Sequence, residues 1–329
     1  MQDRFTQETK LMLRAVPVFI AGLFLFAGQA SAKFCGDQVD GVDVPCACGD
    51  VVVSNLVLGN DPVASAKCEG DGLIVRSPTA TTALQIDLNG KTLRGGDHGV
   101  GIWVVDGGPG GAKVTSGAGR AAIEGFRDAI VARGDRSVSL VENIDVREPA
   151  RDGLRLTGSG YEVRSVDVSK AGRDGIFLDG RGYRCHATNV IGSGRFAYFI
   201  DGHDAIIGKP GAGNTARDSG NDGFHLMGGN LRLNVCESSG NGKDGVSLRG
   251  SAHEVTGCTA RSNGQDGITG EGGALAFYGN SAIDNARNGL VATGVGLIDG
   301  GGNQGSGNRG EGLQRPAVQC VIDRVSCTP

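Results

Sequence analysis

The sequence has few aromatic residues, little proline, a small net charge and no long apolar run beyond its first thirty residues. Aromatic residues make up 5% of the chain, and 9 of its 329 residues are proline. The low proline content and the lack of a Gly-X-Y period exclude collagen, and a hydrophobic fraction of 39% excludes wholesale disorder. A net charge of −4 provides no general attraction to nucleic acid or to anionic membranes.

Glycine, in contrast, is abundant. It accounts for 59 of the 329 residues, far above the usual share of roughly 7%. Glycine destabilises helix interiors, so a mostly helical protein is excluded. A globular chain with this composition must place glycine at many tight turns, where the backbone needs a positive φ.

The N-terminal segment has the features of a secretory signal peptide. Lys10 and Arg14 precede an apolar run over residues 15–27, and Ala30-Ser31-Ala32 forms a small-x-small cleavage site. We expect residues 1–32 to be removed by cleavage after Ala32. The run is short for a membrane span, which makes an uncleaved membrane segment the weaker alternative. The mature protein is therefore expected in the periplasm or secreted, without membrane insertion.

All nine cysteines lie in the predicted mature chain, where export permits disulfides. Four cluster near the start and two near the end, which predicts disulfide-stapled caps over residues 33–83 and 313–329. The first four allow three pairings, and the sequence does not choose among them. Because nine is odd, at least one thiol is expected to be unpaired or paired between molecules. Cys236 and Cys258 lie 22 residues apart and are expected to pack in or near the core.

The middle of the chain is an internal repeat. Asp-Gly or a close variant recurs every 22 to 26 residues, and we call the first residue of each pair the anchor. The anchors are Asp128, Asp152, Asp174, Phe196, Asp222, Asp244, Asp266, Asn288 and Glu311. Serine or asparagine stands three residues before the later anchors, so the turn chemistry also repeats.

A short alternating segment follows each anchor. The residues two and four positions after it are mostly aliphatic or aromatic, and the side chains of a strand alternate between its two faces. Each repeat has room for two or three short strands with turns. This pattern predicts one rung of a parallel β-solenoid that spans residues 84–312 as a single domain.

The repeat resembles the right-handed parallel β-helix superfamily, which includes pectate lyases. The resemblance covers residues 84–312 and depends on the Asn-x-x-Asp-Gly-(Ile/Val) rungs and on the opening Ile86–Leu93. It implies an all-β, single-stranded right-handed β-helix with capped ends. It does not imply one activity, because many enzymes and some non-enzymes share this fold. The signature motifs of polygalacturonases and alginate epimerases are missing, so no catalytic residue is carried over.

Stacked rungs lie about 4.8 Å apart, so residues at equal offsets form columns. The outward columns bring Asp179 and Asp201 together as neighbours, with His225 one rung further on. His225 is the candidate base. The two aspartates are candidates either for binding Ca²⁺ through oxygen ligands or for a glycosidase acid–base pair. The alternative is an ordinary solvated face with aspartates at strand ends.

The same columns contain candidate substrate-binding residues. Phe177 and Phe199, with Trp103 from an earlier rung, are suited to stack on sugar rings. Arg133, Arg155 and Arg249 are suited to hold uronate carboxylates. A basic column just before the anchors, which includes Arg151, Arg173 and Arg195, would suit an extended polyanion. The alternative for that column is local charge compensation by the anchor aspartates.

The repeat breaks once, where Phe196-Ala197 replaces Asp-Gly and the next interval grows to 26 residues. Insertions in solenoids lie in loops, often on the binding face. The rungs around this break are the ones that supply Asp179, Asp201 and His225. Their coincidence favours a site there over a mere irregular loop.

These features predict an exported β-helix protein that binds and modifies an acidic polysaccharide, as a lyase, epimerase or hydrolase. One alternative is a non-catalytic surface or periplasmic protein that binds glycan or acts as a scaffold. Another is an accessory protein of a periplasmic metalloenzyme. We expect a monomer with no nucleic-acid partner, and Ca²⁺ is the one candidate cofactor.

Overall fold

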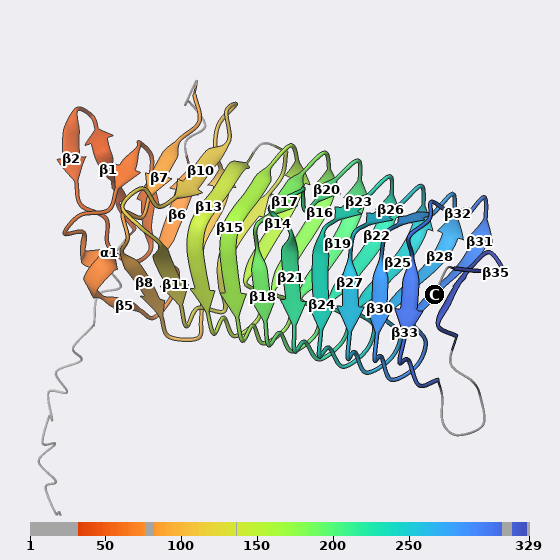
Figure 1. Cartoon of the computed structure of the whole chain (residues 1–329). Helices are drawn as coiled ribbons and strands as arrows, with labels where there is room; N and C mark the ends of the chain where they lie inside the picture. The colour runs from red at the N-terminus through yellow and green to blue at the C-terminus, as the bar shows by residue number, and fades with distance from the viewer. Residues whose placement is uncertain (1–31, 77–81, 136, 311–317, 328–329) are drawn as a thin grey trace, which may run out of the picture. The chain divides into compact units, whose positions relative to one another are not determined.

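The computed structural model describes residues 32–76, 82–135, 137–310 and 318–327 (Figure 1). Residues 1–31 of the predicted signal peptide, the anchor Glu311 and parts of both predicted caps lie outside these residues. The described chain is an all-β solenoid with a single short helix, α1 (Pro62–Ser65). Within the described residues, no helix is long and apolar enough to cross a membrane.

Three parallel ladders of strands run along the solenoid. The first ladder forms sheet 1, whose parallel strands are β1 (Phe34–Val39), β3 (Asp50–Val52), β6 (Leu73–Arg76), β9 (Val100–Asp106), β12 (Asp128–Arg133), β14 (Leu154–Ser159), β16 (Ile176–Arg181), β19 (Tyr198–His203), β22 (Phe224–Gly229), β25 (Val246–Ser251), β28 (Ile268–Gly273), β31 (Leu290–Val295) and β34 (Cys320–Ile322). Two antiparallel strands, β2 (Val42–Val44) and β35 (Val325–Ser326), pair with the first and last of these.

Sheet 2 contains the other two ladders. One consists of β4 (Leu56–Val57), β7 (Gln85–Asp87), β10 (Ala112–Thr115), β13 (Val138–Arg147), β15 (Glu162–Ser169), β17 (Arg184–His186), β20 (Ile206–Ile207), β23 (Arg232–Asn234), β26 (Glu254–Thr256), β29 (Ala276–Tyr278) and β32 (Ile298–Asp299). The other shares the long strands β13 and β15 and adds β5 (Lys67–Cys68), β8 (Thr92–Gly95), β11 (Ala121–Glu124), β18 (Asn189–Ile191), β21 (Asn214–Arg217), β24 (Cys236–Ser239), β27 (Thr259–Arg261), β30 (Ser281–Ile283) and β33 (Gln304–Ser306). This is the parallel β-helix predicted from the repeat.

The predicted inward positions form the core. Two residues after the described anchors from Asp128 to Asn288, each side chain is buried and stacks on its equivalent in the next rung: Ile130, Leu154, Ile176, Tyr198, Phe224, Val246, Ile268 and Leu290. Burial of apolar area is the main favourable contribution to folding. Because each rung buries its face against the next, a single rung is not stable alone.

A glycine with a positive φ lies near the end of each strand of sheet 1 from β14 to β31. Gly202 has a φ of +150°, and a Cβ there would lie 2.0 Å from the carbonyl oxygen of Gly180. Gly180 occupies the same position one rung earlier and meets Gly158 in the same way. Only glycine allows the backbones of neighbouring rungs to approach this closely. The stacked turns therefore account for part of the high glycine content.

Buried asparagines form a second repeated device. Asn241, Asn263, Asn285 and Asn308 stack at the turn before the anchor, and each side-chain amide donates to the carbonyl oxygen of the next asparagine or glutamine. Each carbonyl oxygen also accepts the backbone N–H of the preceding asparagine. The column satisfies buried backbone groups that the turn would otherwise leave unpaired. This is the repeating turn chemistry expected from the sequence.

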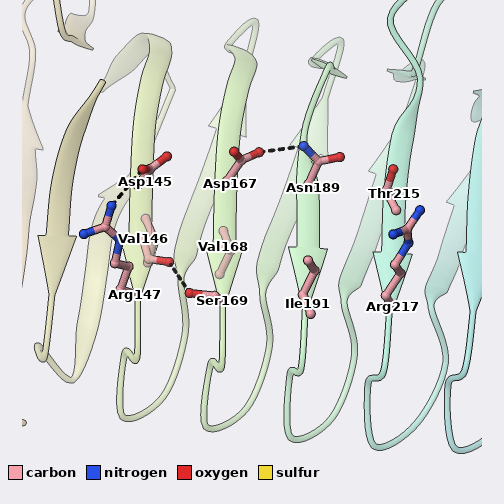
Figure 2. A pocket seen from close by; sticks show the side chains of 10 residues that line it. All are labelled: Asp145, Val146, Arg147, Asp167, Val168, Ser169, Asn189, Ile191, Thr215 and Arg217. Carbon is pink, nitrogen blue, oxygen red and sulfur yellow. Dashed lines mark hydrogen bonds and ion pairs between the residues drawn. The ribbon is translucent and has the colours of Figure 1, made fainter. Parts of the chain in front are cut away.

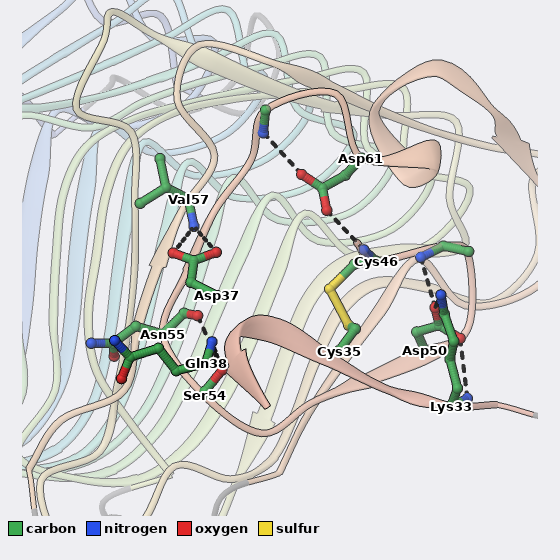
Figure 3. The surroundings of a disulfide bond; sticks show 12 residues. Lys33, Cys35, Asp37, Gln38, Cys46, Asp50, Ser54, Asn55, Val57 and Asp61 are labelled. Atoms are coloured by element: carbon green, nitrogen blue, oxygen red, sulfur yellow. Dashed lines mark hydrogen bonds and ion pairs between the residues drawn. A yellow bond between two sulfur atoms is a disulfide. The ribbon is translucent and has the colours of Figure 1, made fainter. Parts of the chain in front are cut away.

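Four disulfides are present, two near the N-terminus and one near the C-terminus, as predicted for the caps. The pairs are Cys35–Cys46, Cys48–Cys68, Cys236–Cys258 and Cys320–Cys327. Figure 3 shows the first, beside which the backbone N–H of Cys46 donates to the carboxylate of Asp61 at 2.7 Å. Sheet 1 nevertheless begins at β1, inside the predicted N-terminal cap, and the domain boundaries stay a prediction.

The middle pair, Cys236–Cys258, joins neighbouring rungs of the solenoid. The 22-residue spacing that predicted packing in or near the core also places the two cysteines one above the other. Cys185 is the unpaired cysteine expected from the odd number. Burial raises the pKa of its thiol to about 12, so it is protonated at neutral pH.

The anchor aspartates form a third column. From Asp152 to Asn288, apart from Asp222, each anchor donates its backbone N–H to the side-chain Oδ1 of the anchor one rung before, over 2.8–3.4 Å. This arrangement places carboxylates one above another along the solenoid. Burial, helped by the neighbouring carboxylates of Asp222 and Asp266, raises the pKa of Asp244 to about 6.

We expect Asn263→Ala to lower the free energy of unfolding by about 2–4 kcal/mol, because it leaves buried donors and acceptors unpaired on both neighbouring rungs. Asn263 is 1% exposed. The measurement is equilibrium unfolding in urea. Lys243→Ala, at an exposed position on the preceding rung, is the control and stays within about 0.5 kcal/mol of the wild type. Equal stability of the two variants would contradict the ladder's role.

We expect Asp244→Asn to stabilise the protein at pH 8 by roughly 1–2 kcal/mol, and to change its stability little at pH 4. The folded-state pKa of Asp244 lies near 6, above the unfolded value of 3.8. Its contribution is therefore present below pH 3.8 and is lost as the pH rises through 6. Unfolding measured from pH 4 to 8 tests this. Ser247→Ala, which removes no titratable group, is the control, and its stability should differ from that of the wild type by the same amount at every pH. An Asp244→Asn variant less stable than the wild type at pH 8 would contradict the prediction.

Candidate functional site

The central strands of sheet 1 bring one row of predicted site residues together on the outer face. Arg155 on β14, Phe177 on β16, Phe199 on β19 and His225 on β22 are register partners in successive rungs. The guanidinium carbon of Arg155 lies 4.1 Å from the centre of the Phe177 ring. The rings of Phe177 and Phe199 are stacked with centroids 5.1 Å apart, and Phe199 is 5.5 Å from His225. The row is therefore a continuous stack of a cation, two aromatic rings and an imidazole.

His225 is held by a carboxylate that the sequence analysis had assigned only to a turn. Its Nδ1 lies 2.8 Å from Oδ2 of the anchor Asp222, three residues earlier. His225 is 9% exposed and Asp222 is 5% exposed. With Nδ1–H donating to Asp222, the free lone pair is on Nε2, which has no hydrogen-bond partner among the described residues. A carboxylate that orients a histidine in this way is the arrangement of a general base.

Asp179 and Asp201 lie side by side, as predicted from their column. They are register partners on β16 and β19, and both are half-buried. Two inward tyrosines support these strand ends: the hydroxyl of Tyr161 donates to the carbonyl oxygen of Asp179 at 3.2 Å, and that of Tyr183 donates to Asp201 at 3.4 Å. Burial and the charge of Asp201 raise the pKa of Asp179, while Arg155 opposes the shift.

The two aspartates do not form a complete cation site. Ca²⁺ takes six to eight oxygen ligands. Among the described residues, no group of three or more His, Cys, Asp or Glu is arranged to hold a metal ion. Two carboxylates are too few to fit Ca²⁺, and we derive no chemical step through it.

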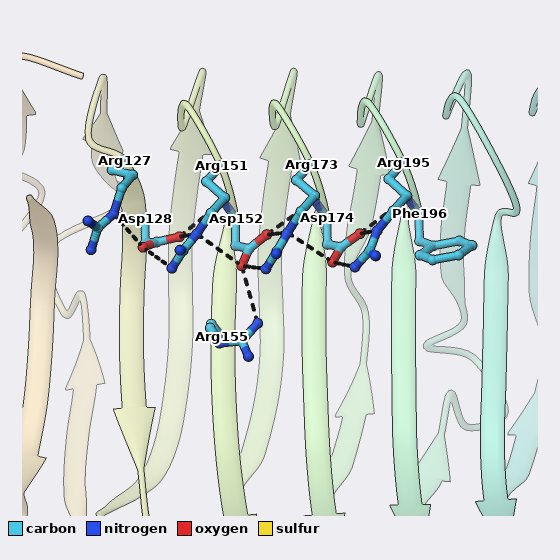
Figure 4. A network of polar contacts seen from close by, with 9 residues as sticks. All are labelled: Arg127, Asp128, Arg151, Asp152, Arg155, Arg173, Asp174, Arg195 and Phe196. Atoms are coloured by element: carbon cyan, nitrogen blue, oxygen red, sulfur yellow. Dashed lines mark hydrogen bonds and ion pairs between the residues drawn. The ribbon is translucent and has the colours of Figure 1, made fainter. Parts of the chain in front are cut away.

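The basic column before the anchors is held in ion pairs (Figure 4). Arg151, Arg173 and Arg195 each bind the anchor carboxylate of the preceding rung through Nε and Nη2, in the order Asp128, Asp152 and Asp174. This is the charge compensation considered as the alternative from the sequence. The guanidinium groups remain partly exposed, and their role in substrate binding stays a prediction.

A depression of 290 Å³ lies on the same face towards the N-terminal end. Trp103, Arg133, Arg127 and Arg151 line it. Trp103 is 37% exposed, and Arg133 forms no ion pair with the described residues. An aromatic face beside an unpaired guanidinium suits a sugar that carries a carboxylate. Arg249 is exposed and lies on β25, the strand that follows the one carrying His225. Among the described residues, no contact between Arg249 and the row is found.

Another depression, of 430 Å³, lies on sheet 2, and none of the predicted site residues line it (Figure 2). Its charged groups are paired: Asp145 pairs with Arg120 and Arg147, Asp167 pairs with Arg120 and Asn189, and Arg217 pairs with Glu237. These pairs leave no convergent reactive group there. The candidate site is therefore on sheet 1.

Two residues of this site were not predicted from the sequence. Asp222 was assigned to the turn column, and Phe196 was identified only as the break in the repeat. The ring of Phe196 is stacked on His225, with the ring centroids 4.7 Å apart. The guanidinium carbon of Arg195 lies 4.8 Å from the centre of the Phe196 ring. Counting residues from the anchor predicts which residues at the same position of successive rungs are neighbours. Asp222 and Phe196 are anchors, whereas His225 lies three residues after an anchor, so this counting does not predict their contacts.

Comparisons with solved structures find polysaccharide-active proteins among those that this chain resembles. The periplasmic alginate epimerase AlgG aligns with a TM-score of 0.51 and 14% identity, over 78% of this chain and 74% of its own. The Azotobacter vinelandii mannuronan C-5 epimerase AlgE4 A-module has a TM-score of 0.41 and 17% identity, over 66% of this chain and 70% of its own. Pectate lyase Pel9A has a TM-score of 0.32 and 12% identity, over 84% and 68%.

These likenesses concern the fold and assign no activity to this chain. No curated protein matches it by sequence. A family model described as the right handed beta helix region matches residues 128–313, which is more than half of the chain. The match agrees with the three parallel ladders and the stacked core. The protein belongs to the right-handed β-helix family.

Proposed function

We propose that this protein binds an acidic polysaccharide along the outer face of sheet 1 and modifies it there, with His225 as the base. The observation that carries the proposal is the Asp222–His225 pair at the end of the row of Arg155, Phe177 and Phe199. The family fold is compatible with this function but does not specify it. The arrangement of side chains on this face is what supports it.

The row matches the requirements of uronate chemistry. The faces of the Phe177 and Phe199 rings are covered by each other, by Arg155 and by His225, so these rings would contact a sugar through their outer edges. Proton abstraction next to a uronate carboxylate needs a positioned base and a cation that stabilises the charge developing on that carboxylate. His225 Nε2 would accept the proton, and Asp222 would stabilise the resulting imidazolium. Arg155 lies three rungs from His225, about 14 Å along the solenoid, whereas the guanidinium of Arg195 lies 5.5 Å from the centre of the Phe199 ring and is the nearer cation.

Asp179 and Asp201 leave hydrolysis as a variant of the same proposal. Their stacking one rung apart gives a carboxylate separation of about 5 Å, the spacing found in retaining glycosidases. The raised pKa of Asp179 keeps its carboxyl protonated to higher pH than usual. That property is the one required of a general acid.

A non-catalytic glycan-binding protein is the second candidate. The observation in its favour is the position of the Trp103–Arg133 depression. Arg133 lies on β12, four strands from His225 in sheet 1, which is a distance of about 19 Å along the solenoid. A protein that only binds an acidic polysaccharide at that depression would need no catalytic base.

Export is part of the proposal. Four disulfides hold the described chain, and disulfides persist in oxidising compartments. Together with the predicted signal peptide, they support a periplasmic or secreted protein. An acidic polysaccharide outside the cytoplasm is then accessible as a substrate.

We expect His225→Gln to lower kcat by at least about 100-fold, because it removes the base. Asp222→Asn is expected to lower kcat as well, because it disturbs the tautomer of His225. The assay incubates the purified mature protein with polyuronates and follows the unsaturated product together with the uronate composition.

Ser247→Ala is the matched control, because Ser247 is the register partner of His225 on the next rung. It should leave kcat and KM unchanged. Full activity of His225→Gln would refute the assignment of the base. Binding without turnover by the wild type would favour the non-catalytic candidate.

We expect Arg155→Ala to weaken polyuronate binding by about 5–10-fold, because it removes a cation from the row and the partner of the Phe177 ring. Arg261→Ala is the matched control: it removes an exposed arginine from β27 on sheet 2, where it pairs with Glu237. The measurement is the affinity of each variant for polyuronate by titration calorimetry. Equal affinities of the two variants would contradict the proposal that sheet 1 carries the binding face.

A further inference from the structure

We infer that Phe196 is a positioning residue: its ring, standing where neighbouring rungs carry an aspartate, holds the His225 imidazole in the orientation that leaves Nε2 free for substrate. The inference rests on the proposed function, since it concerns the same base. Phe196 itself does not react, and the inference follows from the replacement of the anchor aspartate by phenylalanine at this position.

The backbone at Phe196 is that of an ordinary anchor. Its carbonyl oxygen accepts the N–H of Gly175 at 2.9 Å, as the carbonyl of Asp174 accepts the N–H of Gly153 at 2.9 Å. Its own N–H donates to Oδ1 of Asp174 at 3.4 Å, the same bond that Asp174 makes to Asp152 at 3.3 Å. The break in the repeat at this position is therefore a change of side chain within an unchanged turn.

The changed side chain meets the histidine directly. The ring of Phe196 is nearly parallel to that of His225, at an interplanar angle of 21° and a centroid distance of 4.7 Å. Phe199 is nearly parallel to His225 as well, at 20° and 5.5 Å. The two aromatic contacts and the bond to Asp222 together oppose rotation of the imidazole about its χ2 angle. Packing of this kind pre-organises a reacting group.

An aspartate at this position would act against the site. The neighbouring anchors Asp174 and Asp222 already carry carboxylates, one on each adjacent rung. A third carboxylate between them would repel both and would offer the imidazole a second acceptor in competition with Asp222. It would also attract the guanidinium of Arg195, which lies 4.8 Å from the Phe196 ring centre. The aromatic residue removes that competition and leaves Asp222 as the histidine's partner.

The test observes the ring nitrogens of His225 by ¹⁵N NMR in protein labelled at histidine. The chain has five histidines, and the His225 signals are assigned by their loss in His225→Gln. The wild type should show a protonated Nδ1 and an unprotonated Nε2 as two well-separated signals. In Phe196→Leu and Phe196→Asp the two signals should move towards each other, because both tautomers become populated.

Two matched variants separate positioning from general packing. Phe196→Tyr keeps the ring and should retain the wild-type signals. Phe177→Leu removes an aromatic ring from the same face without touching His225, and should leave the His225 signals unchanged while weakening substrate binding. Thermal unfolding of each variant confirms that the solenoid is folded, as expected where the main chain already has the anchor conformation.

The inference is overturned if Phe196→Leu keeps the wild-type pair of signals, or if Phe177→Leu disturbs them as strongly. Where turnover is found, Phe196→Leu should lower kcat by about 10-fold and change the pH profile, with KM little affected. The NMR experiment needs no substrate. A polysaccharide screen without turnover would therefore count against the proposed function and not against the positioning of His225.

Discussion

The register of one rung upon the next is the constraint on which the rest of the structure depends. Neighbouring rungs lie about 4.8 Å apart, so every side chain meets its own equivalent above and below. For aliphatic and aromatic side chains, this stacking gives a continuous core, as the column from Ile130 to Leu290 shows. For polar side chains, it brings like groups together, and each such column needs hydrogen bonds or opposite charges that pair its groups.

The polar columns meet that need in different ways. The asparagines donate to and accept from one another, so the column from Asn241 to Asn308 satisfies itself. Carboxylates repel, and the first three anchors are compensated by arginines from the following rung. The run of these pairs is interrupted after Arg195, because Phe196 stands in place of the next aspartate. Asp222, the anchor that follows, binds His225, and the candidate base lies at this interruption.

The columns that lie at one offset were predictable from the sequence. The inward column, the neighbouring Asp179 and Asp201, and the row of Phe177, Phe199 and His225 all follow from counting residues after the anchors, and the register confirms that they are neighbours. Contacts between different offsets were not predictable in the same way. The pairing of Asp222 with His225 and the stacking of Phe196 on the imidazole depend on how the strand leaves its turn.

The sequence by itself determined the repeat, the fold and the identity of the residues in each column, because the spacing of Asp-Gly and the alternation of apolar residues define one rung and all rungs stack alike. Tertiary structure decided which charged side chains are free. Arg151, Arg173 and Arg195 are bound to buried aspartates, whereas Arg133 and Nε2 of His225 keep no partner among the described residues. The reason is that ion pairs and ring contacts depend on side-chain direction and on burial, which the order of residues along the chain does not specify.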